Sequence, residues 1–131
     1  MKLLSYTLFL ESKKDKFPNI KNVLFNDFNI IIGKDAKSND YITFKVAEDD
    51  EYWFHVKGVP GSHVIIKNNK NQTPDTSVIK EAAILAKKNS KASKEPMSTV
   101  VYCLRKFVSK EPNMNDGQVK VDYINANEIK I

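Results

Sequence analysis

The polar residues best suited to chemistry lie in one short loop, KGVPGSH at residues 57–63, between two apolar runs. Pro60-Gly61 favours a tight turn in which the glycine takes positive φ. Such a turn would expose backbone amides beside Lys57, Ser62 and His63, a combination suited to contacting phosphate or hydroxyl groups. The same loop is also compatible with a purely structural β-turn, so both interpretations stay open at this point.

Two histidines, His55 and His63, flank this loop on neighbouring predicted strands and could lie close together. With Cys103 or an acidic residue they could nominally hold a metal ion, and a histidine beside Ser62 could serve as a general base. The spacing matches no standard zinc pattern, and the four glycines form no phosphate-binding loop. No GxSxG, HExxH or CxxC motif occurs either. We therefore expect no catalytic residue, no metal and no cofactor.

Positive charge is concentrated in one part of the chain. The net charge is +5, yet residues 86–110 alone carry seven basic residues and one acidic residue. A localised basic patch attracts polyanions, although a solvated lysine-rich face has the same composition. Trp53 precedes the 57–63 loop by a few residues; a tryptophan in a strand is usually core, but beside basic and histidine side chains it can stack on a base.

The elements that must position these residues are mainly strands. The sequence predicts one principal helix at about 75–89, with an apolar stripe at helical spacing and a capping hydroxyl and proline at Thr73-Pro74. Residues 34–40 are typical of a turn. Alternation and β-branched content predict strands at 3–10, 23–25, 28–32, 41–46, 52–56, 63–67 and 99–104, and a closing hairpin from 118–123 and 128–131. The predicted class is α+β, a mainly antiparallel β-sheet with one principal α-helix.

The composition is that of an ordinary globular protein. With 131 residues, 41% hydrophobic and 28% charged, the chain has room for a single domain spanning 1–131. No apolar run is long enough to cross a membrane, and the N-terminal residues 1–10 favour a strand over a signal peptide. A lone cysteine, Cys103, fits a reducing compartment, so we expect a cytoplasmic location without membrane association.

Two long stretches of this sequence resemble a known family. Residues 33–47, GKDAKSNDYITFKVA, and 51–66, EYWFHVKGVPGSHVII, closely resemble the NFACT RNA-binding domain, the C-terminal domain of ribosome-quality-control factors once called fibronectin-binding proteins. The segments IKEAAILA, SKA, VVY, RKFV and GQV further along are similar to the family's helix and closing strands. The resemblance spans about 25–131, which leaves 1–24 as an N-terminal strand and loop. Four positions depart from the family's usual residues: Lys34 for arginine, Glu51 for aspartate, Gly58 for a small or acidic residue, and Asp116 for proline.

The resemblance implies RNA binding without catalysis. Its relatives carry this domain beside an N-terminal domain and a coiled coil and hold tRNA on the large ribosomal subunit. This chain is therefore expected to be a stand-alone member or an excised domain that binds tRNA or ribosomal RNA, with the ribosome as a further expected partner. The alternatives are a protein-interaction module on ribosome-associated factors, a DNA or polyanion binder, and a metal protein using the two histidines. No oligomeric state is predicted.

The expected RNA-binding residues follow from the charge pattern and the resemblance together. Phosphate contacts are expected from Lys34, Lys37, Lys57, Lys87, Lys88, Lys91, Lys94, Arg105 and Lys106, shorter-range hydrogen bonds from His55, Ser62 and His63, and base stacking from Trp53.

Overall fold

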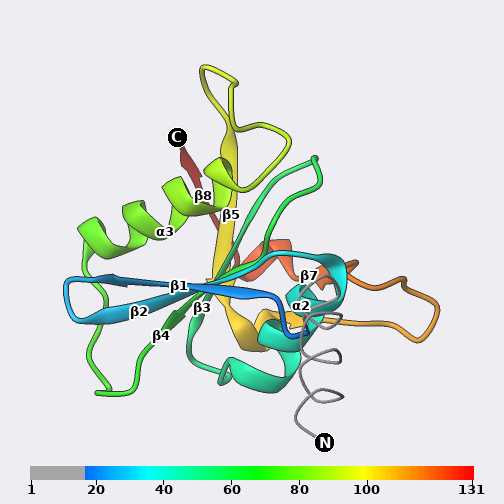
Figure 1. Ribbon diagram of the computed structural model, residues 1–131, viewed down its shortest axis with the longest axis horizontal. Helices are drawn as coiled ribbons and strands as arrows, with labels where there is room; N and C mark the ends of the chain where they lie inside the picture. The colour runs from blue at the N-terminus through cyan, green and yellow to red at the C-terminus, as the bar shows by residue number, and fades with distance from the viewer. Residues whose placement is uncertain (1–16) are drawn as a thin grey trace, which may run out of the picture.

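The computed structural model describes residues 17–131 and is built around a six-stranded antiparallel sheet in the order β1-β2-β4-β3-β5-β8. Helix α3 lies across one face of this sheet, and the long connection between β6 and β7 reaches away from it (Figure 1). This confirms the α+β class with one principal helix. The strands are β1 Ile20–Phe25, β2 Phe28–Gly33, β3 Tyr52–Val56, β4 Val64–Lys67, β5 Thr99–Leu104 and β8 Asn127–Lys130, with a separate pair, β6 Val108–Ser109 and β7 Lys120–Val121. The helical elements are α2 Ala36–Tyr41, η1 Ile42–Val46, α3 Thr76–Lys88, η2 Arg105–Phe107 and η3 Tyr123–Asn125.

The first hairpin forms as its turn residues predict. Asn26 and Asp27 both take positive φ, 48° and 67°, which is the requirement of a two-residue turn between twisted antiparallel strands. Phe25 and Phe28 face each other across the turn, and β2 continues to Gly33. The hairpin is one of the elements that the local sequence specifies directly.

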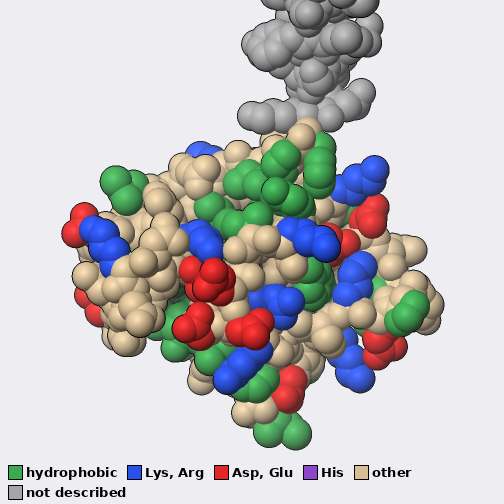
Figure 2. All heavy atoms as spheres, turned by 90° about the horizontal axis from the view of Figure 1, so that it is seen from below, with side chains coloured by type: hydrophobic (Ala, Val, Ile, Leu, Met, Phe, Trp, Pro, Cys, Tyr) green, Lys and Arg blue, Asp and Glu red, His purple; other side chains and the backbone are tan. Residues whose placement is uncertain are grey.

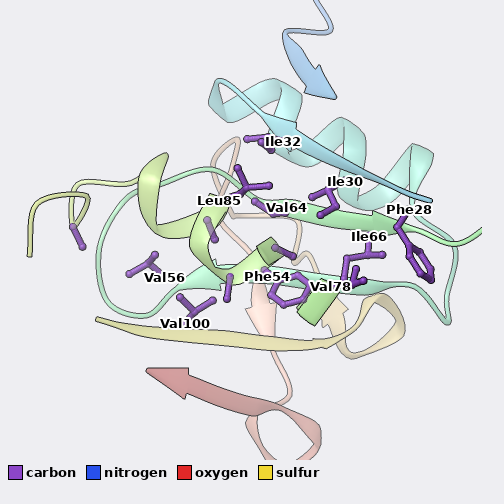
Figure 3. Packing of buried hydrophobic residues seen from close by; sticks show 14 residues of the cluster. Phe28, Ile30, Ile32, Phe54, Val56, Val64, Ile66, Val78, Leu85 and Val100 are labelled. Atoms are coloured by element: carbon purple, nitrogen blue, oxygen red, sulfur yellow. The ribbon is translucent and has the colours of Figure 1, made fainter. Parts of the chain in front are cut away.

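Helix α3 packs on the sheet and makes the larger of two cores. Its N-cap is Asp75, whose carboxylate accepts hydrogen bonds from the amides of Ser77 and Val78. The predicted cap at Thr73 was therefore wrong, although the predicted helix range of 75–89 is confirmed within a residue at each end. Figure 3 shows the packed side chains between helix and sheet, among them Ile30, Ile32, Phe54, Val56, Val64, Ile66, Val78, Leu85 and Val100.

The opposite face of the sheet carries the second core. Because side chains alternate along a strand, Trp53 and His55 lie on this face while Phe54 and Val56 point to α3. Trp53 pairs in register with Cys103, and His55 with Val101. The cover on this side comes from η1 and from the chain around β6 and β7, as the partners of this cluster show: Ile42, Phe44, Val108, Val119 and Val121. Trp53 and His55, the residues of β3 predicted to contact RNA, therefore lie on the face that α3 does not cover.

Residues 34–46 differ from the prediction of a turn followed by a strand. They form α2 and then a single π-helical turn, η1. The Asp35 side chain accepts a hydrogen bond from the Ser38 amide at 2.8 Å, which caps α2. Ile42 and Val46 fit strand alternation, but they are also four residues apart and so share one helical face. The segment is helical because its apolar face packs on the sheet, although its sequence also fits the alternation of a strand.

The predicted closing hairpin is also wrong. Strand β7 pairs with β6, Val121 opposite Val108, while β8 pairs with β5, Asn127 opposite Tyr102. Strand β8 pairs with a strand distant in sequence, and β7 pairs with the preceding strand β6 across the connection 110–119. Local alternation identifies neither pairing. The predicted strand at 3–10 lies outside the described residues. Within residues 17–131, no helix combines the length and the apolar character that crossing a membrane requires.

Candidate nucleic-acid interface

A groove of about 1060 Å³ opens on the sheet face opposite α3, where β3 ends and the 57–63 loop begins. Its floor includes Trp53 and His55 from β3 and Val101 from β5. Its walls come from four segments distant in sequence: residues 34–36 with Asn39, the loop 57–63, residues 88–91 at the end of α3, and residues between 114 and 121 together with Tyr123. The fold thus assembles one hollow from parts that local sequence patterns do not connect.

The 57–63 loop is fastened to the end of α3. The Ser62 amide donates to the Asn89 carbonyl at 2.9 Å, and the Lys91 amide donates to the Pro60 carbonyl at 3.0 Å. Gly61 is opposite Ser90 in an isolated bridge, and a Cβ at Gly61 would stand 2.6 Å from the Ser90 Cβ. A glycine is therefore required by close approach and not by positive φ, which in this loop belongs to Gly58 at +82°.

Four lysines line the groove: Lys34, Lys57, Lys88 and Lys91. All four are exposed. The Lys34 ammonium donates to Asn89 Oδ1 at 2.7 Å, and the Lys57 ammonium pairs with Glu128 at 2.8 Å, which raises the pKa of Lys57. The lining carries two carboxylates, Asp35 and Asp116, against four lysine ammonium groups. The Asp35 carboxylate also caps α2. The groove is therefore net positive.

The two histidines lie together on the floor, with ring centroids 5.4 Å apart in an edge-to-face arrangement. His63 is 1% exposed and shares a hydrogen bond of 2.9 Å between its Nδ1 and Thr43 Oγ1. Burial lowers the pKa of His63 to about 3, assisted by the neighbouring His55, and burial also lowers the pKa of His55. Both rings are neutral near pH 7, so they can offer hydrogen bonds and not positive charge. The buried His63 supports the floor, and the half-buried His55 is the more accessible ring.

Trp53 is part of the core. It is 1% exposed, stacks on His55 at 5.9 Å, and packs edge-on against His63 at 5.2 Å. The predicted stacking of Trp53 on a base was therefore wrong, because no face of its ring is exposed. Its indole Nε1 is buried and has no hydrogen-bond partner among the described residues. Ser62 lines the groove but is only 8% exposed.

The basic segment 86–110 does not form one surface. Strand β5 separates its two ends by six residues, about 20 Å at the rise of an extended strand. Lys88 and Lys91 reach the groove at one end; Arg105 and Lys106 lie at the other, where their amides donate to the carbonyls of Glu51 and Asp49. The basic residues that the charge count treated as one patch therefore lie in two separate places.

Two of the predicted phosphate-binding cations have structural partners instead. The Lys87 ammonium is buried and donates to the carbonyls of Glu95 and Ile131 at 2.6 and 2.8 Å. The Arg105 guanidinium donates to the Thr43 carbonyl at 2.6 Å and lies over the Phe44 ring. These side chains fasten loops to the sheet and do not line the groove, so the structure gives them a structural role in place of the predicted phosphate contact. Three further predicted cations, Lys37, Lys94 and Lys106, are exposed but do not line the groove.

Several lining residues were not predicted at all. Asn39 links α2 to the loop, since its Oδ1 accepts from the His63 amide at 2.9 Å and its Nδ2 donates to the Gly61 carbonyl. The wall at 114–121 docks through Lys110, whose ammonium contacts the Asp40 carboxylate at 2.9 Å. Tyr123 borders the groove from η3. These roles depend on tertiary contacts, and no local motif announces them.

The underside of the molecule has a different character. Figure 2 shows acidic and basic side chains interspersed there, with a hydrophobic area next to the grey residues and no histidine in view.

In the second core, Cys103 is buried, and burial raises the pKa of its thiol to about 11, so it is held as a thiol near pH 7. Within residues 17–131, no three histidine, cysteine or carboxylate side chains are grouped closely enough to hold a metal ion.

Comparisons of the sequence with known proteins all indicate the same family. The sequence model of the NFACT protein RNA binding domain matches residues 19–122. The Rqc2 homolog RqcH of Bacillus subtilis (strain 168) is 38% identical over 93 residues, which is 71% of this chain and 16% of the relative. The Rqc2 homolog RqcH of Streptococcus suis (strain 05ZYH33) is 48% identical over 63 residues, 48% of this chain and 11% of the relative.

A solved structure supports the same likeness. The C-terminal part of the fibronectin/fibrinogen-binding protein from Streptococcus suis superposes with a TM-score of 0.78 and 32% identity, over 86% of this chain and 44% of that one. The chain spans less than a fifth of the length of the curated relatives.

Proposed function

This chain belongs to the family of NFACT protein RNA binding domains, and on that premise we propose that it binds tRNA or ribosomal RNA through the lysine-lined groove without catalysing a reaction. The observation that carries the proposal is the convergence of four lysines from three separate segments around one hollow. Phosphates are the commonest partners of such cations on RNA-binding surfaces.

The groove combines long-range and short-range recognition. Its lysines are flexible point charges, which attract a phosphate backbone without the two-pronged geometry that arginine would impose. The neutral His55 ring and the backbone of the 57–63 loop supply groups that discriminate by hydrogen bonding at contact distance. Lys34 replaces the family's usual arginine, so we expect positioning of the backbone to be less rigid at that wall.

The proposed setting is translation, and specifically ribosome quality control in the cytoplasm. Its support is the likeness to proteins named as Rqc2 homologs, of which this chain matches a small part. The module would add RNA affinity to an assembly and leave any further activity to other components. A protein-interaction role on a ribosome-associated factor, or binding of DNA, is separated from this proposal by the experiment below.

The test is fluorescence anisotropy with labelled tRNA, a ribosomal RNA stem-loop and a DNA strand of matched length, each over a salt series starting at about 50 mM. The proposal expects RNA binding that weakens steeply as salt rises, because released counterions drive phosphate binding. No RNA binding at the lowest salt would contradict it, and an affinity insensitive to salt would favour a protein partner. Crosslinking and sequencing of RNA bound in cells would then distinguish tRNA from ribosomal RNA.

A further inference from the structure

One aromatic ring on the groove is open to solvent. Tyr123 is 58% exposed and lines the groove from η3, whereas the other large aromatic on the lining, Trp53, is 1% exposed. The next residue, Ile124, is 94% exposed. Exposure of two large apolar side chains in sequence, at the mouth of a polar hollow, is costly unless something covers them.

The backbone under Tyr123 is firmly held. The Asp122 carboxylate caps η3 by accepting from the Ile124 amide at 3.1 Å and from Asn125 Nδ2 at 2.8 Å. The Asp122 amide in turn donates to the Phe107 carbonyl at 2.9 Å, which ties the turn to η2. The ring is therefore presented from a fixed turn, and ordering it on binding costs little conformational freedom.

A cation already lies at this ring. The Lys57 ammonium is 5.6 Å from the Tyr123 centroid and 2.8 Å from Glu128. Both members of that ion pair are about half exposed, so solvent screens it and a phosphate can compete for the lysine. A nucleotide placed here would meet an aromatic face and a phosphate-binding cation a few ångströms apart, which matches the spacing of its own base and backbone.

We propose that Tyr123 is a stacking platform for one unpaired base, so that the groove selects single-stranded segments of RNA over duplex. This inference rests on the proposed function and names the class of RNA that the groove takes. A base can lie flat on Tyr123 only when one of its faces is free, and inside a double helix the neighbouring bases cover both faces. The base would also cover part of the exposed apolar surface at Tyr123 and Ile124.

The experiment compares wild type, Y123A and Y123F for binding to a single-stranded RNA of about ten nucleotides and to a duplex of the same sequence. Loss of one base–aromatic stack predicts that Y123A binds the single strand about 5- to 150-fold more weakly. Duplex affinity should change by less than about twofold, and Y123F, which keeps the ring, should bind both as wild type does. An unchanged thermal midpoint checks that the exposed substitution leaves the fold intact.

Three results would overturn the proposal. Equal single-strand affinity of Y123A and wild type would show that no base stacks there, and would leave the Tyr123–Ile124 surface to a protein partner. Equal losses on single strand and duplex would show that the ring does not select unpaired RNA. Wild type binding duplex as tightly as single strand would remove the selectivity itself. A K88A/K91A variant, measured in parallel, tests the proposed function independently of Tyr123. If K88A/K91A loses RNA binding while Y123A does not, the groove still binds RNA and only the stacking proposal fails.

Discussion

The sharpest consequence of the split basic segment is a pair of charge-matched variants. K88A/K91A removes two lysines that line the groove, and K94A/K106A removes two exposed lysines that do not. Each lowers the net charge by two, from +5 to +3, so a general electrostatic attraction would weaken equally in both. Only a localised site distinguishes them.

The expected magnitude follows from the number of groove lysines. On single-stranded RNA the logarithm of the affinity falls with the logarithm of salt by about 0.7 for each phosphate contacted, so four lysines give a slope of up to about −2.8. K88A/K91A should reduce the slope to about −1.4 and, at about 0.1 M salt, weaken binding about 25-fold. K94A/K106A should keep the wild-type slope.

The assay is fluorescence anisotropy with a labelled single strand at several salt concentrations, and unfolding curves confirm that both variants fold as wild type does. Equal weakening of the two variants would refute the assignment of binding to the groove. A slope unchanged in K88A/K91A would refute the phosphate contacts themselves.

Three further predictions concern how the groove is held. G61V places a side chain against Ser90, so it should cost about 1–3 kcal/mol of stability, measured by urea unfolding, and should weaken RNA binding, measured by anisotropy. Wild-type stability and wild-type affinity would show that the loop does not depend on close contact with the end of α3. Burial lowers the pKa of His63 in the folded protein to about 3, below the ordinary histidine value of 6.5, so between these pH values the unfolded chain binds one more proton than the folded chain. Stability should therefore fall as pH drops from about 6.5 towards 3. Urea unfolding at pH 7 and pH 5 checks this, and H63Q should show a shallower pH dependence. K87M leaves the Glu95 carbonyl without its donor and removes one of the two donors to the Ile131 carbonyl, the other being the Ser98 amide, and should cost about 1–3 kcal/mol. RNA affinity should stay within about twofold of wild type, and a large loss of affinity would support Lys87 as an RNA contact.

Much of the fold could be predicted from the sequence, because the local sequence signals of these elements agree with one another. The Asn26-Asp27 turn, the apolar stripe of the main helix and the β-rich runs before and after the 57–63 loop each specify one structure. The failures occurred where two structures shared one pattern or where alternation alone did not specify which strands pair. Residues 42–46 satisfy both a strand and a helical turn, and the final strands pair with β5 and β6 instead of each other.

The candidate site divides in a similar way. Lys34, Lys57, Lys88 and Lys91 were predicted from charge and resemblance, and the structure brings them to one groove. A charge count cannot tell an exposed cation from one that is bonded to carbonyls, so it did not separate Lys87 and Arg105 from the lysines that line the groove. Tyr123 escaped notice because nothing in its local sequence separates an exposed aromatic from a core one, and its exposure arises from the capped turn that presents it.

The most direct test of the groove as the RNA-binding surface is ultraviolet crosslinking of the protein to single-stranded RNA, followed by mass spectrometry of the crosslinked peptides. The groove predicts crosslinks in residues 55–63, 88–91 and 114–123, which line it from separate parts of the chain. Crosslinks confined to residues 42–51 or 105–107, at the opposite end of β3 and β5, would contradict it.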